Sequence, residues 1–127
     1  CIRLTIIKDI NDILPEKYAG LLQIGLPDFI EVKSYMHVGA SQQRLKRENM
    51  LVFSEIKQFS QELVKCLPEY EIASEHVPSR VVLLAKKKFK HKDGWHTWLD
   101  FQKWSELVND GKEPLTEDYT TKIVDVD

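Results

Sequence analysis

The chain has 127 residues, of which 43% are hydrophobic and 30% charged, and its formal net charge is −2. This length fits one domain or a piece of a larger protein. The hydrophobic fraction excludes a globally disordered chain, and the near-zero charge excludes a generic polyanion binder, although a local basic patch can still bind phosphate. The two cysteines are too few for a disulfide scaffold and too few to hold a zinc ion or an iron–sulfur cluster alone.

The sequence shows no signal peptide and no apolar run of membrane-spanning length. Free cysteines favour a reducing compartment. We therefore expect a cytoplasmic protein with no membrane partner. The chain begins at Cys1, directly inside a strand-like run, and this is typical of a fragment of a longer protein.

Two strand patterns near the start of the chain flank one helix. Apolar residues alternate along 2–8, which predicts a strand, and a second short strand is expected at 29–33. Between them, Pro15 suits the first position of a helix that Gly25 ends. The apolar face of this helix is expected to consist of Tyr18, Leu21 and Leu22. A strand, a helix and a strand in this order predict parallel pairing with a right-handed crossover.

Residues 34–49 have no clear period and read as a polar, basic loop that carries Arg44, Lys46 and Arg47. A second helix is expected at about 52–66, and Pro68 stops it. Its apolar residues recur at spacings of three and four, which predicts a buried face. These residues are Phe53, Ile56, Phe59, Ser60, Leu63 and Leu67.

The second half of the chain begins with an expected antiparallel hairpin, whose strands at 71–74 and 80–86 are joined by a connection containing Pro78. Asp93-Gly94 indicates a turn, and 95–99 is expected to add a third strand. Asp100 then caps a helix that ends near Gly111. The apolar face of that helix is expected to consist of Phe101, Trp104, Leu107 and Val108.

The end of the chain is acidic. Thr116 is expected to cap a last helical turn around Tyr119, and the acids of 110–127 are expected to form a solvated, partly ordered tail.

Polar residues that can carry chemistry cluster in the hairpin. Glu75, His76 and Ser79 are the ingredients of acid–base or nucleophilic catalysis, which would make the protein a small hydrolase. The alternative is a polar hairpin loop that satisfies its own backbone, and the absence of a GxSxG elbow around Ser79 favours this second interpretation. The four histidines lack metal-ligand spacing, so no metal site is expected.

A lysine cluster follows the hairpin, between residues 86 and 92, and contains no acid. Its members are Lys86, Lys87, Lys88, Lys90 and Lys92. Phe89, Trp95 and Trp98 flank it. Lysines neutralise phosphates and aromatic rings stack on unpaired bases, so one interpretation is an RNA-binding surface. The other is a solvated strand end whose aromatic residues belong to the core.

Six segments, in order, resemble the C-terminal part of the wyosine-synthesising radical-SAM family, the tRNA 4-demethylwyosine synthases. The segments are RLTIIK (3–8), PDFIEVKSYMHVG (27–39), ENMLVFSEIKQF (48–59), YEIASEHVPSRVVLLA (70–85), GWHTWLDFQKW (94–104) and LTEDYTTK (115–122). The resemblance covers nearly the whole chain and includes the wyosine base formation region.

The resemblance implies a specific activity for the full-length enzyme. Such enzymes, of the radical-SAM carbon–carbon lyase class, convert N1-methylguanosine in phenylalanine tRNA to 4-demethylwyosine with pyruvate. They use S-adenosylmethionine and 4Fe-4S clusters, and some carry a flavodoxin-like domain that binds FMN. The CxxxCxxC cluster motif of the family is absent from these residues. We therefore expect the fragment alone to be inactive, to hold no cofactor, and to act with phenylalanine tRNA and the N-terminal remainder of the same protein.

The resemblance also suggests roles for individual residues, none of them catalytic. Arg3, Thr5 and Lys8 lie on a barrel strand, where some face the cofactor end; Thr5 and Glu31 are the expected cofactor contacts, and no metal ligand is expected. The expected substrate or tRNA contacts are Lys33, Arg44, Lys46, Arg47, Glu75, His76, Ser79, Arg80, Lys86, Lys88 and Lys90. Of these, Glu75, His76, Ser79 and Arg80 are expected to shape the tRNA site.

The expected fold is α/β: the last βαβ part of a partial radical-SAM (β/α) barrel, followed by an α+β extension with an antiparallel hairpin. Residues 1–40 would be the end of the barrel and 41–127 the wyosine-forming C-terminal region. The alternative function is a stand-alone RNA-binding or interaction module without catalysis.

Overall fold

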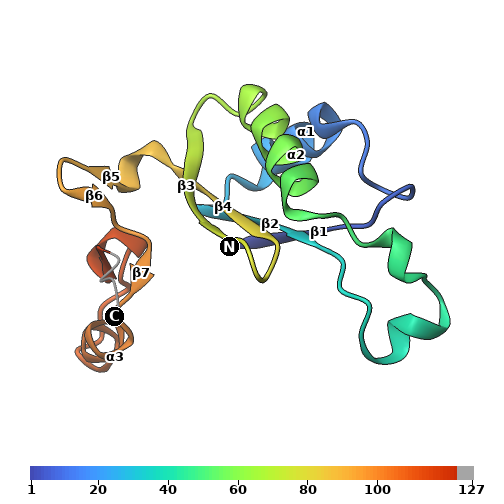
Figure 1. Ribbon diagram of the computed structural model, residues 1–127. Coiled ribbons are helices and arrows are strands. Elements are labelled where there is room, and N and C mark those ends of the chain that lie inside the picture. The colour runs from blue at the N-terminus through green and yellow to red at the C-terminus, as the bar shows by residue number, and fades with distance from the viewer. Residues whose placement is uncertain (123–127) are drawn as a thin grey trace. The chain divides into compact units, whose positions relative to one another are not determined.

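The computed structural model describes residues 1–122 of the chain (Figure 1). The chain divides into two compact units, which we call unit 1 (Cys1–Ala85) and unit 2 (from Lys86 onward). The last part of the expected acidic tail, 123–127, lies outside the described residues. No helix within residues 1–122 combines the length and the apolar character that crossing a bilayer requires.

Unit 1 is built on a four-stranded sheet with the order β1-β2-β4-β3. Strand β1 (Ile2–Ile6) pairs in parallel with β2 (Phe29–Ser34), from Ile2 opposite Ile30 to Ile6 opposite Ser34. Strand β4 (Val81–Lys86) pairs antiparallel with β2, from Phe29 opposite Ala85 to Lys33 opposite Val81. Strand β3 (Tyr70–His76) completes the predicted hairpin with β4. The predicted parallel βαβ unit and the hairpin are therefore both confirmed.

Two helices, α1 (Pro15–Gly25) and α2 (Phe53–Lys65), cover the same face of this sheet (Figure 1). Pro15 stands at the start of α1, where its missing N–H is not needed. The predicted face of α2 is buried, with Ile56 and Leu63 at 0% exposure, and it packs on Val32 and Leu84 of the sheet in one hydrophobic core. Burial of each such side chain stabilises the fold by about 1.5 to 3 kcal/mol.

The predicted face of α1 is partly wrong. Leu22 is buried and Tyr18 packs against the core, but Leu21 is 68% exposed and Ala19 is buried instead. At about 100° per residue, Ala19 lies about 60° from Leu22 but about 160° from Leu21, so a face that buries Ala19 and Leu22 leaves Leu21 outside. The width of that face depends on the sheet beneath it, and the helix sequence does not reveal it.

The predicted loop of 34–49 contains two short 3₁₀ turns, η1 (Gly39–Gln43) and η2 (Arg47–Asn49). The ends of this loop are tied to the sheet. The Tyr35 N–H donates to the Ile6 carbonyl over 2.8 Å, and the Leu51 N–H donates to the Ser34 hydroxyl over 3.0 Å. The guanidinium of Arg80 donates to the Leu51 carbonyl over 2.9 Å. The loop thus has a fixed base despite its lack of periodic structure.

Unit 2 consists of short elements. After η3 (Lys87–Phe89), strand β5 (Lys90–His91) pairs antiparallel with β6 (Gly94–Trp95), which confirms the turn at Asp93-Gly94. Strand β7 (Trp98–Leu99) pairs with β8 (Thr120–Thr121). The single strand predicted at 95–99 is therefore wrong. The His96 N–H donates to the Phe89 carbonyl over 2.8 Å, so the chain leaves one hairpin there before it joins the other.

Helix α3 (Phe101–Asn109) begins as predicted, because the Asp100 carboxylate accepts from the Lys103 N–H over 2.9 Å. Its predicted apolar face is present, but Phe101 is 72% exposed and no residue of α3 is buried. The last turn, η4 (Thr116–Asp118), is also present. Its N-cap position is Leu115 instead of the predicted Thr116, and the Asp118 carboxylate accepts from the Leu115 N–H over 2.9 Å.

Candidate functional site

Three chain segments meet at the carboxyl end of the parallel strands β1 and β2. Residues 7–14 follow β1, and the basic loop 35–51 follows β2. The turn of the β3–β4 hairpin, Val77 to Arg80, joins them there because β4 starts at Val81, opposite Lys33. In sheets with parallel strands, ligand sites form beyond the carboxyl ends of the strands. We call this region of unit 1 the carboxyl edge.

The face of the sheet opposite α1 and α2 carries polar residues. Side chains alternate along a strand, and Ile30 and Val32 point into the core, so Glu31 and Lys33 point to the other face. The register places Arg3 beside Glu31 and Thr5 beside Lys33. The predicted residues of β1 and β2 therefore share one face of the sheet in unit 1.

Some of these polar groups are already engaged. Arg3 forms an ion pair with Glu31, with 2.5 Å between Nε and Oε2. The Lys33 ammonium donates to the Ser79 carbonyl over 2.7 Å and so connects β2 to the hairpin turn. Thr5 is exposed. Of the two predicted cofactor contacts, Thr5 has an open side chain while Glu31 is held by Arg3.

A hollow of about 180 Å³ lies beside the hairpin. Its walls are Glu31, Ser74, Glu75, His76, Val81 and Leu83. Three predicted site residues, Glu31, Glu75 and His76, thus line one cavity, although Glu31 is far from the other two in sequence. Glu75 forms an ion pair with Lys57 of α2, with 2.9 Å between Nζ and Oε1.

The side chains of His76 and Ser79 lie within hydrogen-bond distance of each other. Their Nδ1 and Oγ atoms are 2.7 Å apart, and the Ser79 N–H also donates to Nδ1 over 3.3 Å. Because a backbone N–H only donates, Nδ1 is an acceptor and the neutral ring carries its proton on Nε2. A hydrolase triad would need a carboxylate to orient the ring, but Glu75 is committed to Lys57. The geometry thus favours a hairpin turn whose polar groups bond to one another over a catalytic role for Ser79 as a nucleophile.

The basic residues of the loop 35–51 are exposed at the carboxyl edge. Within residues 1–122, Arg44, Lys46 and Arg47 form no ion pair. Glu48 is the only acid of the loop. Arg80, another predicted contact, has φ of 49° in the left-handed region and uses its guanidinium to hold Leu51. Arg80 therefore positions the loop, while the other three cations remain open to an anion.

Lys8, by contrast, faces α2. Its ammonium lies 2.6 Å from Oε1 of Glu55. This hydrogen bond is the main cause that raises the pKa of Lys8 and lowers the pKa of Glu55, and the Val52 N–H lowers the Glu55 pKa further. Lys8 thus fastens the end of β1 to the start of α2 and is not directed to the open face of the sheet.

The lysine cluster belongs to unit 2, where it is partly engaged. Lys88 forms an ion pair with Glu117 at 2.5 Å and lies over the Phe89 ring. Lys90 lies over the Trp95 ring, 5.7 Å from its centroid. Phe89 is fully buried, as the core interpretation predicts, whereas Trp98 is 45% exposed. Lys86 ends β4.

The histidines of unit 2 do not form a metal site. His91 and His96 stack with centroids 3.9 Å apart, and Nε2 of His96 lies 2.9 Å from Asp93. That contact holds the pKa of Asp93 below its usual range. Stacked rings direct their nitrogens side by side instead of toward one centre, and residues 1–122 contain no group of three or more ligands suited to a metal.

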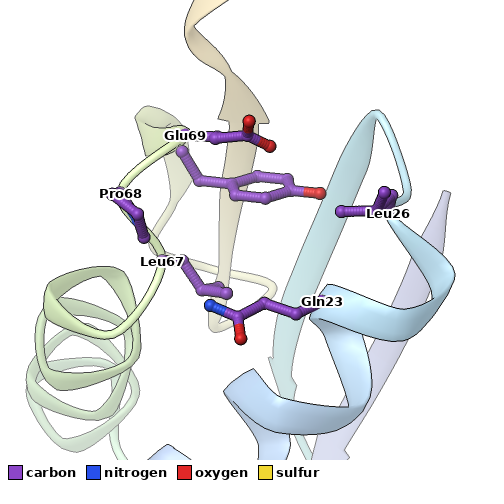
Figure 2. A pocket seen from close by; sticks show the side chains of 6 residues that line it. Gln23, Leu26, Leu67, Pro68 and Glu69 are labelled. Atoms are coloured by element: carbon purple, nitrogen blue, oxygen red, sulfur yellow. The ribbon is translucent and has the colours of Figure 1, made fainter.

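A larger hollow, of about 260 Å³, lies elsewhere in unit 1 (Figure 2). Figure 2 shows Gln23 and Leu26 on one side of it and Leu67, Pro68 and Glu69 on the other. It lies near the amino end of β2, roughly 15 Å along the strand from the carboxyl edge at about 3.3 Å per residue. The Gln23 amide already donates to the Cys66 carbonyl. None of the predicted residues lines this hollow, so the carboxyl edge remains the candidate site.

Comparison with known proteins identifies the family. The family described as wyosine base formation matches residues 24–86. The tRNA 4-demethylwyosine synthase of Oryza sativa subsp. japonica is 44% identical over 120 residues, which are 92% of this chain and 18% of that protein. The enzyme of Homo sapiens is 41% identical over 109 residues, which are 85% of this chain and 15% of that protein. The chain belongs to the tRNA 4-demethylwyosine synthase family.

Solved structures of synthases agree with this assignment. One, "Structure of TYW1 with a lysine-pyruvate adduct bound", matches with a TM-score of 0.61 and 38% identity over 69% of this chain and 27% of that chain. The crystal structure of archaeal TYW1 matches with a TM-score of 0.55 and 30% identity, over 69% of this chain and 26% of that chain. The chain therefore spans less than a fifth of the length of the curated synthases quoted above, and its mixed α/β fold matches part of the solved ones.

One group at the carboxyl edge was not predicted. Tyr35, His37 and Ser41 form a hydrogen-bonded chain within the loop. A Tyr-Met-His sequence after a strand carries no general signal for such a chain, because the contact with Ser41 depends on how the loop turns back at Gly39.

Proposed function

We propose that the chain is the C-terminal part of a tRNA 4-demethylwyosine synthase and that its carboxyl edge lines the site for phenylalanine tRNA. The full-length enzyme would convert N1-methylguanosine to 4-demethylwyosine with pyruvate, in the cytoplasm, as a step of wybutosine biosynthesis. The observation that carries this proposal is the position of the open cations Arg44, Lys46 and Arg47, on a loop within the family-matched residues 24–86 and at the end of parallel strands where ligands bind.

The arrangement of β1, α1 and β2 supports a place for unit 1 at the end of a partial radical-SAM barrel. β1 is an edge strand of the sheet, and in a barrel it would pair with a preceding strand of the same protein. Both helices cover one face, as the outer helices of a barrel do. The opposite face, with Thr5, Glu31 and Lys33, would then line the interior. The division into a barrel end at 1–40 and a wyosine-forming region at 41–127 remains part of this proposal, although β2 and β4, from either side of that boundary, share one sheet.

The residues present fit only part of the cofactor set. The Thr5 hydroxyl and the Glu31 carboxylate can accept hydrogen bonds from an amino acid ammonium or ribose group, so they suit an edge of an S-adenosylmethionine site. That cofactor would supply radical chemistry. Cys1 and Cys66 do not fit a 4Fe-4S cluster, which needs three or four thiolates. We assign the clusters, and FMN where a flavodoxin-like domain occurs, to other parts of the enzyme.

Binding of tRNA would rest first on the basic loop and second on Lys86, Lys88 and Lys90. The loop is favoured because its cations are open and its base is fixed by Arg80 and Ser34. Lys88 would have to leave Glu117 to reach a phosphate. Glu75, His76 and Ser79 would shape the wall of the site beside Lys33, and we assign them no chemical step.

Complementation tests the proposal. The whole gene that encodes the chain would be expressed in cells that lack the synthase, and the nucleosides of their phenylalanine tRNA analysed by mass spectrometry. We expect 4-demethylwyosine or its products to appear. Continued accumulation of N1-methylguanosine, with the protein present and folded, would contradict an enzymatic role. Retained tRNA binding in that case would favour the RNA-binding module instead.

A further inference from the structure

A chain of hydrogen bonds runs through the start of the basic loop. The Tyr35 hydroxyl lies 3.0 Å from Nδ1 of His37 and 3.0 Å from Oγ of Ser41. The Ser41 hydroxyl in turn donates to the Val38 carbonyl over 2.5 Å. Tyr35 is buried, with 5% exposure, so the packing around its ring holds the hydroxyl in place.

The last link sets the direction of the whole chain. A carbonyl oxygen only accepts, so the single proton of Ser41 is committed to Val38. Ser41 must then accept from Tyr35, whose own proton is thereby used. The Tyr35 oxygen can only accept from His37, so Nδ1 carries a proton and the neutral ring leaves Nε2 as a lone pair. With the opposite tautomer Tyr35 would donate to His37, and the Tyr35 and Ser41 oxygens, 3.0 Å apart, would be left without a proton between them while Ser41 donates to Val38.

The backbone of His37 is also fixed. Its N–H donates to Sδ of Met50 over 3.2 Å, and its carbonyl accepts from the Gln42 amide over 3.1 Å. The ring packs edge-on against Tyr35, with centroids 6.2 Å apart. The side chain is only partly buried, and among residues 1–122 no hydrogen bond to Nε2 is found. A ring held in this way is a preorganised acceptor at the carboxyl edge.

We infer that the hydrogen-bond chain fixes the neutral tautomer of His37 with its proton on Nδ1, and that Nε2 accepts a hydrogen bond from an N–H group of a ligand bound at the carboxyl edge. The identity of the ligand rests on the proposed function: an unpaired nucleobase of the tRNA presents N–H donors on its Watson–Crick edge. Arg44, Lys46 and Arg47, on the same loop, would hold the phosphates near that base.

The same geometry permits proton transfer without rearrangement. When Nε2 takes a proton, the N–H bond of the ligand breaks, its electron pair stays on the ligand nitrogen, and an imidazolium forms. Nδ1 carries a proton in both states, so the links to Tyr35, Ser41 and Val38 keep their direction. A general base that needs no reorganisation in its own hydrogen bonds is suited to repeated use.

Long-range ¹H–¹⁵N NMR spectra of the ¹⁵N-histidine-labelled chain show directly which ring nitrogen of His37 carries the proton, at a pH where the rings are neutral. We expect His37 to carry its proton on Nδ1. His76 is a matched internal control, because the Ser79 N–H makes its Nδ1 an acceptor and places the proton on Nε2. A spectrum in which His37 also carries its proton on Nε2 would overturn the inference.

Two variants test whether the hydrogen bonds of Tyr35 and Ser41 fix the tautomer of His37. In Ser41→Ala the Tyr35 hydroxyl loses its acceptor and becomes free to donate to His37, so we expect the tautomer to reverse while His76 stays unchanged. In Tyr35→Phe the fraction with the proton on Nδ1 should fall. An unchanged Nδ1–H form in both folded variants would show that the chain does not fix the ring.

Unmodified phenylalanine tRNA transcript tests the ligand. We expect the Nε2 resonance of His37 to shift on saturation and that of Nδ1 to stay. Binding without a shift at Nε2 would refute the ligand assignment alone. The absence of any binding would refute both the ligand assignment and the proposed function, while the spectrum of the free chain still decides the polarity.

Discussion

The basic loop offers the sharpest quantitative prediction. Arg44, Lys46 and Arg47 are exposed and open, so each can neutralise one phosphate. Each such contact contributes about 0.7 to 0.9 to the slope of log affinity against log salt. Replacing all three with Gln should therefore reduce the slope by about 2 to 3. Between 50 and 200 mM salt, the unaltered chain should lose about 20- to 40-fold more affinity than this variant.

Filter binding of phenylalanine tRNA at several salt concentrations measures both slopes. A matched control removes three exposed lysines from other surfaces: Lys17 on α1, Lys65 at the end of α2 and Lys112 after α3. This control has the same net charge as the loop variant, so it separates a local contact from a general charge effect. The reasoning fails if the loop variant keeps the original slope, or if the control loses as much of it.

Three further predictions concern the basic loop and α2 of unit 1, and α3 of unit 2. Arg80→Ala removes one of the two groups that reach the Leu51 carbonyl and leaves the Ser34 hydroxyl as the other, so we expect a loss of about 1 kcal/mol in chemical denaturation and faster proteolysis within 35–51; unchanged cleavage would contradict the positioning role. Glu55→Gln should lower the free energy of unfolding at neutral pH. The advantage of the unaltered chain should vanish as the pH falls below 4.5 through the lowered pKa of Glu55, and also as the pH rises above 10.5 through the raised pKa of Lys8. A difference in stability that does not depend on pH would refute this coupling. Asp100→Ala should destabilise α3 by about 1 kcal/mol, visible as faster amide exchange in that helix only.

Local sequence patterns predict the helices and strands of unit 1 well because the spacing of apolar residues there matches the face that each element buries. The alternation of 2–8 and the three-and-four spacing from Phe53 to Leu67 each reflect one buried face. Pro15 and Pro68 mark helix ends for backbone reasons that hold in any context, whereas Gly25 is the last residue of α1 and the left-handed backbone falls on Leu26 instead. These signals are local, so a single sequence reveals them.

Unit 2 is harder to predict because its strands have only two residues each. Trp95 and Trp98 share a strand-like run, yet they pair with different partners, β5 and β8. The pairing of β7 with β8 depends on tertiary closure between residues more than twenty positions apart, whereas β5 and β6 form a local hairpin. The exposure of Leu21 and Phe101 is a similar case, since helical spacing indicates an apolar face but not what covers it.

The sequence suggests candidate site residues, whose roles remain predictions, but it does not reveal how these residues are arranged. The grouping of Glu31, Glu75 and His76 around one hollow follows from the strand order β2-β4-β3, which joins distant segments. The commitments of Lys8 to Glu55 and of Arg80 to Leu51 are likewise tertiary. His37 carries no sequence signal of its role, because its polarity is set by a turn that returns Ser41 to Tyr35.

Hydrogen–deuterium exchange of the chain with and without phenylalanine tRNA tests the central claim most directly. If the carboxyl edge is the tRNA-facing side of a synthase segment, the amides of 35–51 and of the turn from Val77 to Arg80 should be protected on binding, while the outer surfaces of α1 and α2 should exchange unchanged. Protection confined to those helices, or no change at the carboxyl edge under saturating tRNA, would contradict it.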